Sequence, residues 1–175
     1  MTRFAYLSTA ALISAALFAT QALAHVTLEN RQATVGASYK AVFRVPHGCS
    51  GSPTVKLRVQ IPEGVINAKP MPKPGWTLEI VNGKYKSSFD YYGTQLSEGA
   101  KEIVWSGGKL ADDNYDEFVV NTYLAAGLPA NTMLYFPVVQ ECESGVHRWI
   151  DIPAEGKSPD DYEMPAPGVR LLPKV

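Results

Sequence analysis

The residues best suited to chemistry in this chain are its three histidines, His25, His47 and His147. His25 directly follows Ala-Leu-Ala at positions 22–24, a small-x-small tripeptide typical of signal-peptidase sites. Cleavage there would give His25 a free amine, which could close a six-membered chelate ring around a metal together with the imidazole Nδ1. Imidazole and amine nitrogens suit Cu(II), which leads the affinity order of the divalent first-row metals. The sequence therefore predicts an N-terminal copper chelate.

The other two histidines each have a functional and a plainer interpretation. His47 follows Val45-Pro46 and lies beside Cys49, so a disulfide at Cys49 would hold its loop in place. The alternative is a solvated loop histidine. His147 comes two residues before Trp149, and such a spacing puts both side chains on one face of a strand. The alternatives there are an exposed strand histidine and a core tryptophan.

The two cysteines, Cys49 and Cys142, predict one disulfide if the chain is exported to an oxidising compartment. Such a bridge closes a loop of about 90 residues, for which the chain-entropy model gives about 4–5 kcal/mol of stabilisation. A competing hypothesis is a blue-copper site, because Cys142 and His147 match part of its ligand pattern and His47 could be the second histidine. The next methionine, Met164, is distant, and Cys49 would be left unpaired.

The first 24 residues predict a cleaved secretory signal. Arg3 supplies its basic region, and an apolar run around residues 12–18 supplies its hydrophobic region. The whole chain has a formal charge of −1, and removal of Arg3 leaves about −2 on residues 25–175. This balance argues against a nucleic-acid partner. We expect a single domain over residues 25–175, located in the periplasm.

The rest of the chain predicts strands and no amphipathic helix. Val55, Leu57 and Val59 alternate with polar residues at the period of two that is typical of a half-buried strand. Asn82-Gly83 predicts a hairpin turn, and the proline-rich segment from Pro153 predicts an irregular tail. The expected strands cover residues 39–45, 55–61, 76–81, 85–92, 101–105, 118–124, 134–140 and 146–152. The fold class is all-β, an antiparallel β-sandwich that is immunoglobulin-like, fibronectin-III-like or cupredoxin-like.

Several motifs also carry a resemblance to a known family, and they cover nearly all of residues 25–175 in order. The motifs are His25-Val26-Thr27, Arg44-Val45-Pro46-His47-Gly48-Cys49, Ile61-Pro62-Glu63-Gly64-Val65, Pro74-Gly75-Trp76, Val104-Trp105-Ser106-Gly107-Gly108, Asp116-Glu117-Phe118, Gln140-Glu141-Cys142 and Trp149-Ile150-Asp151-Ile152-Pro153. The chain resembles the YcnI-like domain (DUF1775), in its proteobacterial type. The resemblance implies a β-sandwich that handles copper and is associated with neighbouring copper importers and chaperones.

The resemblance also implies a ligand set, a monohistidine brace for Cu(II) with a carboxylate and a nearby tryptophan. His25 and Trp149 carry over directly. Gram-positive members have an acidic residue just after the Val-Pro motif, where this chain has His47. His47 is therefore the expected second ligand, with Glu117 as the alternative carboxylate, while His147 is expected to contribute little.

The function expected from these observations is a non-enzymatic periplasmic protein that stores, carries or delivers Cu(II). Its expected partners are the copper ion and a periplasmic copper chaperone or a membrane copper importer. The alternatives are a blue-copper electron-transfer domain and a copper-dependent oxidative enzyme. A fourth interpretation is an interaction module that binds no metal.

Overall fold

A computed structural model of the chain describes residues 25–174. The predicted signal at residues 1–24 lies outside the described residues. Within residues 25–174, no helix is long and apolar enough to cross a membrane.

Residues 25–174 form twelve strands and one short 3-10 helix, η1 (Pro159–Asp161). In chain order the strands are β1 (Thr27–Leu28), β2 (Gln32–Thr34), β3 (Ala37–Val45), β4 (Thr54–Gln60), β5 (Val65–Pro70), β6 (Thr77–Tyr91), β7 (Thr94–Leu110), β8 (Asp116–Leu124), β9 (Met133–Tyr135), β10 (Val138–Cys142), β11 (Val146–Trp149) and β12 (Gly168–Leu172). The predicted all-β class is confirmed.

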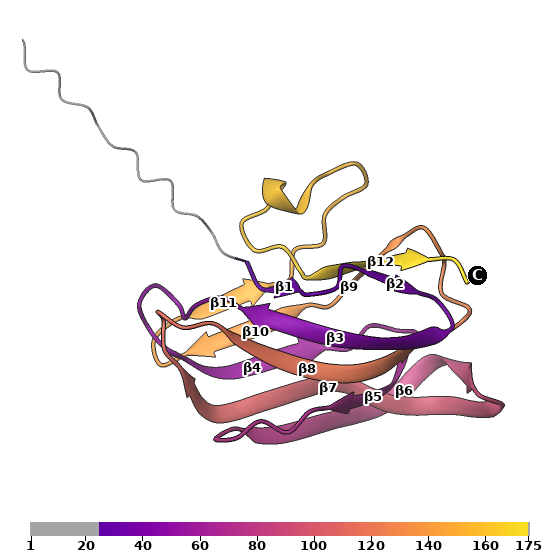
Figure 1. The fold of residues 1–175 in the computed structure, drawn as a ribbon, viewed down its shortest axis with the longest axis horizontal. Helices are drawn as coiled ribbons and strands as arrows, with labels where there is room; N and C mark the ends of the chain where they lie inside the picture. Colours follow the sequence, from indigo (N-terminus) through magenta and orange to yellow (C-terminus); the bar gives the residue numbers. More distant parts are fainter. Residues whose placement is uncertain (1–24, 175) are drawn as a thin grey trace, which may run out of the picture.

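Two antiparallel sheets form the body of the molecule (Figure 1). The first has the strand order β1-β3-β8-β5, and the second has the order β11-β10-β4-β7-β6. A smaller sheet of β2, β12 and β9 lies along the side of the molecule where the chain ends (Figure 1). The inward faces carry the apolar residues of each alternating strand, as expected of a sandwich.

Aromatic side chains join the two sheets across the core. Trp105 on β7 and Phe118 on β8 have ring centroids 5.4 Å apart, and Phe43 on β3 lies 5.5 Å from Phe136. All four are buried. Edge-to-face pairs of this kind contribute about 0.5–1.5 kcal/mol each beyond the area they bury.

The hairpin turn expected at Asn82-Gly83 is wrong. β6 runs through both residues, and the chain reverses at Tyr92 and Gly93, whose φ angles of 49° and 84° are those a two-residue hairpin loop needs. Gly83 instead pairs across the strands with Gly99. A side chain at Gly99 would overlap the Tyr85 ring, so these glycines permit close packing within a long hairpin.

The chain after Pro153 is also more regular than expected. It contains η1 and then β12, which pairs in parallel with β2 and antiparallel with β9. Val169 and Leu171 alternate along β12 and are both buried, and this short apolar alternation accounts for the strand. The segment between β11 and β12 lies against the His25 end of the sandwich.

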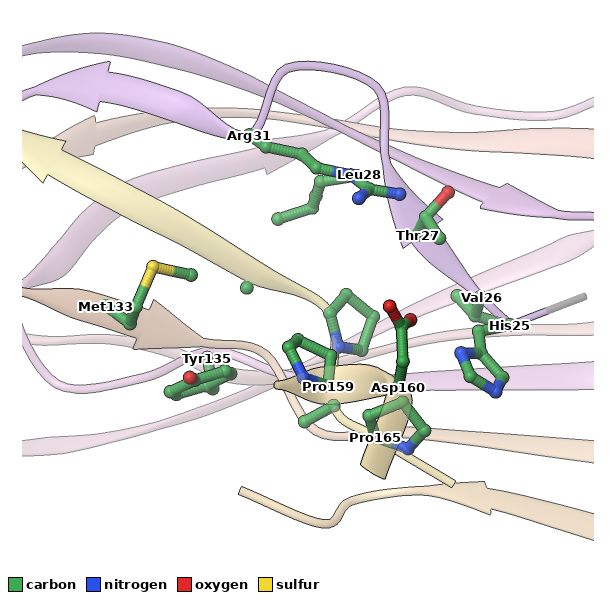
Figure 2. A pocket seen from close by; sticks show the side chains of 13 residues that line it. His25, Val26, Thr27, Leu28, Arg31, Met133, Tyr135, Pro159, Asp160 and Pro165 are labelled. Carbon is green, nitrogen blue, oxygen red and sulfur yellow. The ribbon is translucent and has the colours of Figure 1, made fainter. Parts of the chain in front are cut away.

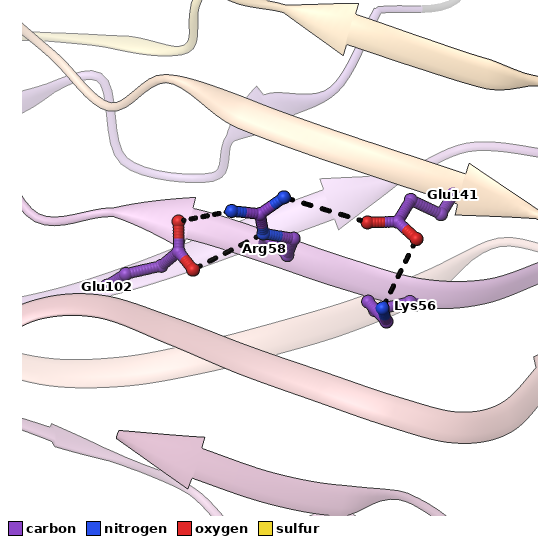
Figure 3. Close-up of polar contacts among 4 residues, drawn as sticks. All are labelled: Lys56, Arg58, Glu102 and Glu141. Atoms are coloured by element: carbon purple, nitrogen blue, oxygen red, sulfur yellow. Dashed lines mark hydrogen bonds and ion pairs between the residues drawn. The ribbon is translucent and has the colours of Figure 1, made fainter. Parts of the chain in front are cut away.

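The outer face of the second sheet carries a network of charged side chains (Figure 3). Arg58 on β4 donates two hydrogen bonds, of 3.3 and 3.1 Å, to the Glu102 carboxylate on β7. Arg58 also lies 3.8 Å from Glu141, which is 3.3 Å from Lys56. Opposite charges thus face each other across neighbouring strands on this side of the sheet, and such cross-strand pairs stabilise it.

We expect Arg58→Ala to lower the free energy of unfolding by about 1 kcal/mol, because the bidentate pair is half exposed and screened by solvent. The loss should shrink in 1 M salt. Urea denaturation at low and high salt measures both values. A loss above about 3 kcal/mol would contradict the picture of a solvent-facing network.

Candidate metal centre

The three histidines lie in one row of rings at one end of the sandwich, with His25 and His147 beside Trp149 and His47 beside His147. The rings of His25 and Trp149 have centroids 5.7 Å apart, and those of His147 and Trp149 are 5.4 Å apart. The His47 ring lies 6.2 Å from that of His147. Trp149 itself is 1% exposed. Three segments that are far apart in sequence therefore place their imidazoles in one neighbourhood.

The β10–β11 pair sets the position of His147 and Trp149. The register pairs Gln140 with His147 and Val138 with Trp149, so these four side chains share a face. That face points into the sandwich, whereas the next residue, Arg148, points to solvent. The shared face of the histidine and the tryptophan is the one that the sequence predicts, and the structure shows that it points inward.

The segment between β3 and β4 positions His47. Just after His47 it forms a tight turn, closed by hydrogen bonds of 2.8 and 3.0 Å between the backbone groups of Cys49 and Ser52. A side chain at Gly48 would overlap the Ser52 carbonyl group, so only glycine fits there. The predicted disulfide between Cys49 and Cys142 is present, with a Cα–Cα distance of 6.0 Å. It joins this loop of the first sheet to the end of β10 in the second.

The hydrogen bonding of His47 and the burial of His147 favour metal binding. His47 Nδ1 donates a 2.6 Å hydrogen bond to the Gly48 carbonyl oxygen, so Nε2 is the ring nitrogen that could bind a metal. Histidine ligands in metalloproteins commonly donate their other nitrogen to a backbone carbonyl in this way. Burial and the neighbouring His47 lower the pKa of His147, with partial opposition from Asp112 and Glu163. His147 is therefore neutral at pH 7, the state that a metal requires.

Two ring nitrogens in the cluster are buried without a hydrogen-bond partner among the described residues, His25 Nε2 and His147 Nδ1. An unpartnered buried polar atom costs about 1–3 kcal/mol and calls for an explanation. Metal ligation supplies one for His147. For His25, the buried Nε2 leaves Nδ1 as the nitrogen available to close a chelate ring with a free amine.

The spacing of His47 and His147 is compatible with a shared metal ion. With metal–nitrogen bonds of about 2.0 Å, two imidazoles on one ion have centroids at most about 6.3 Å apart. The observed 6.2 Å lies within that reach. Among residues 25–174, no three His, Cys, Asp or Glu side chains converge as a ready metal site. A third donor would therefore come from another group, such as the His25 amine.

His25 also borders a cavity of about 200 Å³ (Figure 2). β1 forms one wall, Met133 and Tyr135 of β9 form another, and the segment from Pro159 to Gly168 closes it. Figure 2 shows the Asp160 carboxylate and the His25 imidazole on the same side of this cavity. His25 is thus reachable by a small ligand through this cavity.

Glu117, the alternative carboxylate, lies elsewhere. It is on β8, opposite Arg44 on β3, and its carboxylate is 4.0 Å from the Arg44 guanidinium. Arg44 in turn lies opposite Thr27 on β1, so Glu117 is two strands, about 10 Å, from β1. The structure places His25 beside Trp149 and His47 beside His147, and it pairs Glu117 with Arg44 instead.

Comparison with known proteins agrees with the fold. A family model described as a domain of unknown function, DUF1775, matches residues 25–171. The chain belongs to the DUF1775 family. A solved structure from Nocardia farcinica, described as an uncharacterized protein with an immunoglobulin-like fold, is 26% identical, with a TM-score of 0.62. That match covers 85% of this chain and 98% of the other, and the predicted immunoglobulin-like fold is confirmed. No curated protein matches the chain.

The disulfide excludes the blue-copper interpretation for this DUF1775 domain. A blue-copper site needs a free thiolate, and Cys142 has none because its sulfur is bonded to Cys49. The backbone carbonyl of Met164 accepts a hydrogen bond from Asp151, and its side chain packs against the core. The electron-transfer interpretation built on Cys142 is therefore wrong.

Two residues that the sequence does not single out as ligands lie beside the histidines in this DUF1775 domain. Asp112 has its carboxylate against Gly48, within 3.1 Å of where a side-chain carbon on that glycine would stand. Gln140 is fully buried and contacts both Trp149 and the His47 loop. Gln140 had a usable signal, since it is a polar residue at the end of an apolar strand. Asp112 lies in an acidic run that looks like a solvated loop.

Proposed function

We propose that this protein binds Cu(II) in the periplasm and holds it for transfer to another protein. The single observation that carries the proposal is the row of rings in which His25 and His147 both lie beside Trp149 and His47 lies beside His147. Imidazole is the commonest protein ligand for metals, and it suits copper. The disulfide fits an oxidising compartment, which supports export after cleavage at residue 24.

In this proposal His25 provides the amine and imidazole of the chelate, and His47 provides a further nitrogen through Nε2. His147 joins them, which revises the expectation that it contributes little. Trp149 covers the site from the core side and limits the access of solvent and reductants. Glu117 has no role, because Arg44 already pairs with it. The cavity beside His25 gives a partner's ligand a route to the metal.

Single histidine variants of the mature protein test the proposal. We expect His47→Ala and His147→Ala each to weaken Cu(II) binding at least about tenfold. Each should also change the nitrogen hyperfine pattern in electron paramagnetic resonance. The matched control is Arg148→Gln, because Arg148 neighbours His147 on β11 but faces solvent. Isothermal titration calorimetry gives the affinities.

Three outcomes would count against the proposal. Wild-type protein that binds no Cu(II) would refute it outright. Unchanged affinity and spectra in both histidine variants would restrict copper to His25. Rapid consumption of a reductant with cleavage of a polysaccharide would favour the oxidative-enzyme alternative instead.

A further inference from the structure

Gln140 is a fully buried polar side chain with every hydrogen-bonding group in use. Its Oε1 accepts a 2.9 Å hydrogen bond from the indole Nε1 of Trp149. Its Nε2 donates one 2.7 Å bond to the His47 carbonyl oxygen and another to Thr54 Oγ1. The residue is 0% exposed. Buried amides with complete partners are strongly fixed in orientation.

The partners leave this amide only one orientation. The indole nitrogen of Trp149 can only donate, and the His47 carbonyl can only accept. A flipped amide would face donor with donor and acceptor with acceptor, and both contacts would be repulsive. The side chain of Gln140 therefore ties the indole of β11 and the backbone of His47 to one rigid point on β10.

These two tethers fix the parts of the candidate site that come from different sheets. His47 belongs to the loop after β3 in the first sheet, and Trp149 belongs to β11 in the second. Trp149 in turn lies edge-on to His147 and beside His25. A shift of the amide would move the His47 ring relative to the other two imidazoles. The disulfide also joins the His47 loop to β10, but it does so at Cys49, two residues after His47. The His47 carbonyl itself is held by Gln140.

We propose that Gln140 is the positioning residue of the copper site, a role that rests on the function proposed above. It touches no metal. It acts by holding the His47 backbone and the Trp149 indole at the separation in which the imidazoles can share one ion. Residues that orient metal ligands in this way typically change metal affinity by 10–100-fold when they are replaced.

Two substitutions at Gln140 test the role. Gln140→Met keeps the size and removes both tethers, so Cu(II) affinity should fall about 10–100-fold, with an altered nitrogen hyperfine pattern. Gln140→Glu sets a carboxylate oxygen against the His47 carbonyl, so Cu(II) affinity should fall. It keeps the acceptor for Trp149, so the indole N–H should stay protected from hydrogen exchange. Thr54→Val is the matched control, because it removes the third bond and spares both tethers. It should change affinity less than about threefold.

A double variant shows whether Gln140 acts through His47. In the His47→Ala background, Gln140→Met should weaken binding by less than about threefold further, because the ligand that it positions is already absent. A full additional loss there, or wild-type affinity and spectra in both Gln140 variants, would overturn the role. Wild-type protein that binds no Cu(II) would refute the function. In that case, unchanged exchange of the Trp149 indole N–H in the metal-free Gln140→Met protein would refute the tether as well.

Discussion

Adding one alanine before His25 of the mature protein is expected to weaken Cu(II) binding by about a hundredfold or more. The extra residue turns the terminal amine into an amide nitrogen, which no longer closes the chelate ring with the imidazole. A second tethered donor raises affinity by about 10²–10⁴-fold through effective concentration, and this is the contribution that is lost. The imidazole, Trp149 and the fold all remain. Calorimetric titration of the two forms with Cu(II) measures the difference.

Two further forms make this result specific to the amine. Acetylation of the His25 amine adds no residue and should cause the same loss. An alanine added after Val175 lengthens the chain equally and should leave the affinity unchanged. Equal affinities for the extended, acetylated and native forms would eliminate the N-terminal chelate, and the site would then bind copper without the His25 amine.

Local pattern predicts most of this fold because each strand carries its own signal. Leu57 and Val59 face the core while Lys56 and Arg58 face solvent, and that alternation is visible without any tertiary information. The prediction of a turn at Asn82-Gly83 is wrong because local sequence alone does not decide where a hairpin turns. Several dipeptides can adopt a hairpin turn, and the pairing of Gly83 with Gly99 across the strands decides which one does.

The candidate site is less predictable because its parts meet only in three dimensions. The sequence indicates that His147 and Trp149 share a strand face, and the structure agrees. It suggests a meeting of His47 and His147 only through the blue-copper hypothesis, which is wrong. The 6.2 Å between their ring centroids depends on how the two sheets pack. Gln140 was overlooked for a similar reason, since its three partners come from three separate segments.

The Cys49–Cys142 disulfide links the loop after β3 to the end of β10. Of the substitutions considered, its removal should lower the free energy of unfolding most. The double variant Cys49→Ser, Cys142→Ser opens a loop with a sequence separation of 93. The chain-entropy model then predicts that the free energy of unfolding falls by about 4–5 kcal/mol, and native disulfides typically contribute about 2–5 kcal/mol. Denaturant titration of wild type and variant gives the difference.

Copper binding by the same variant separates the two restraints on the His47 loop. Gln140 and the backbone bonds between Cys49 and Ser52 still hold this loop when the bridge is gone. We therefore expect the folded variant to lose Cu(II) affinity by no more than about tenfold. That is smaller than the largest loss expected for Gln140→Met, which is about 100-fold. The control for the stability measurement is wild-type protein treated with a phosphine reductant. It keeps both sulfur atoms and should show the same loss in free energy of unfolding. If removal of the bridge abolished Cu(II) binding in protein that circular dichroism shows to be folded, the disulfide rather than the Gln140 amide would be what positions His47.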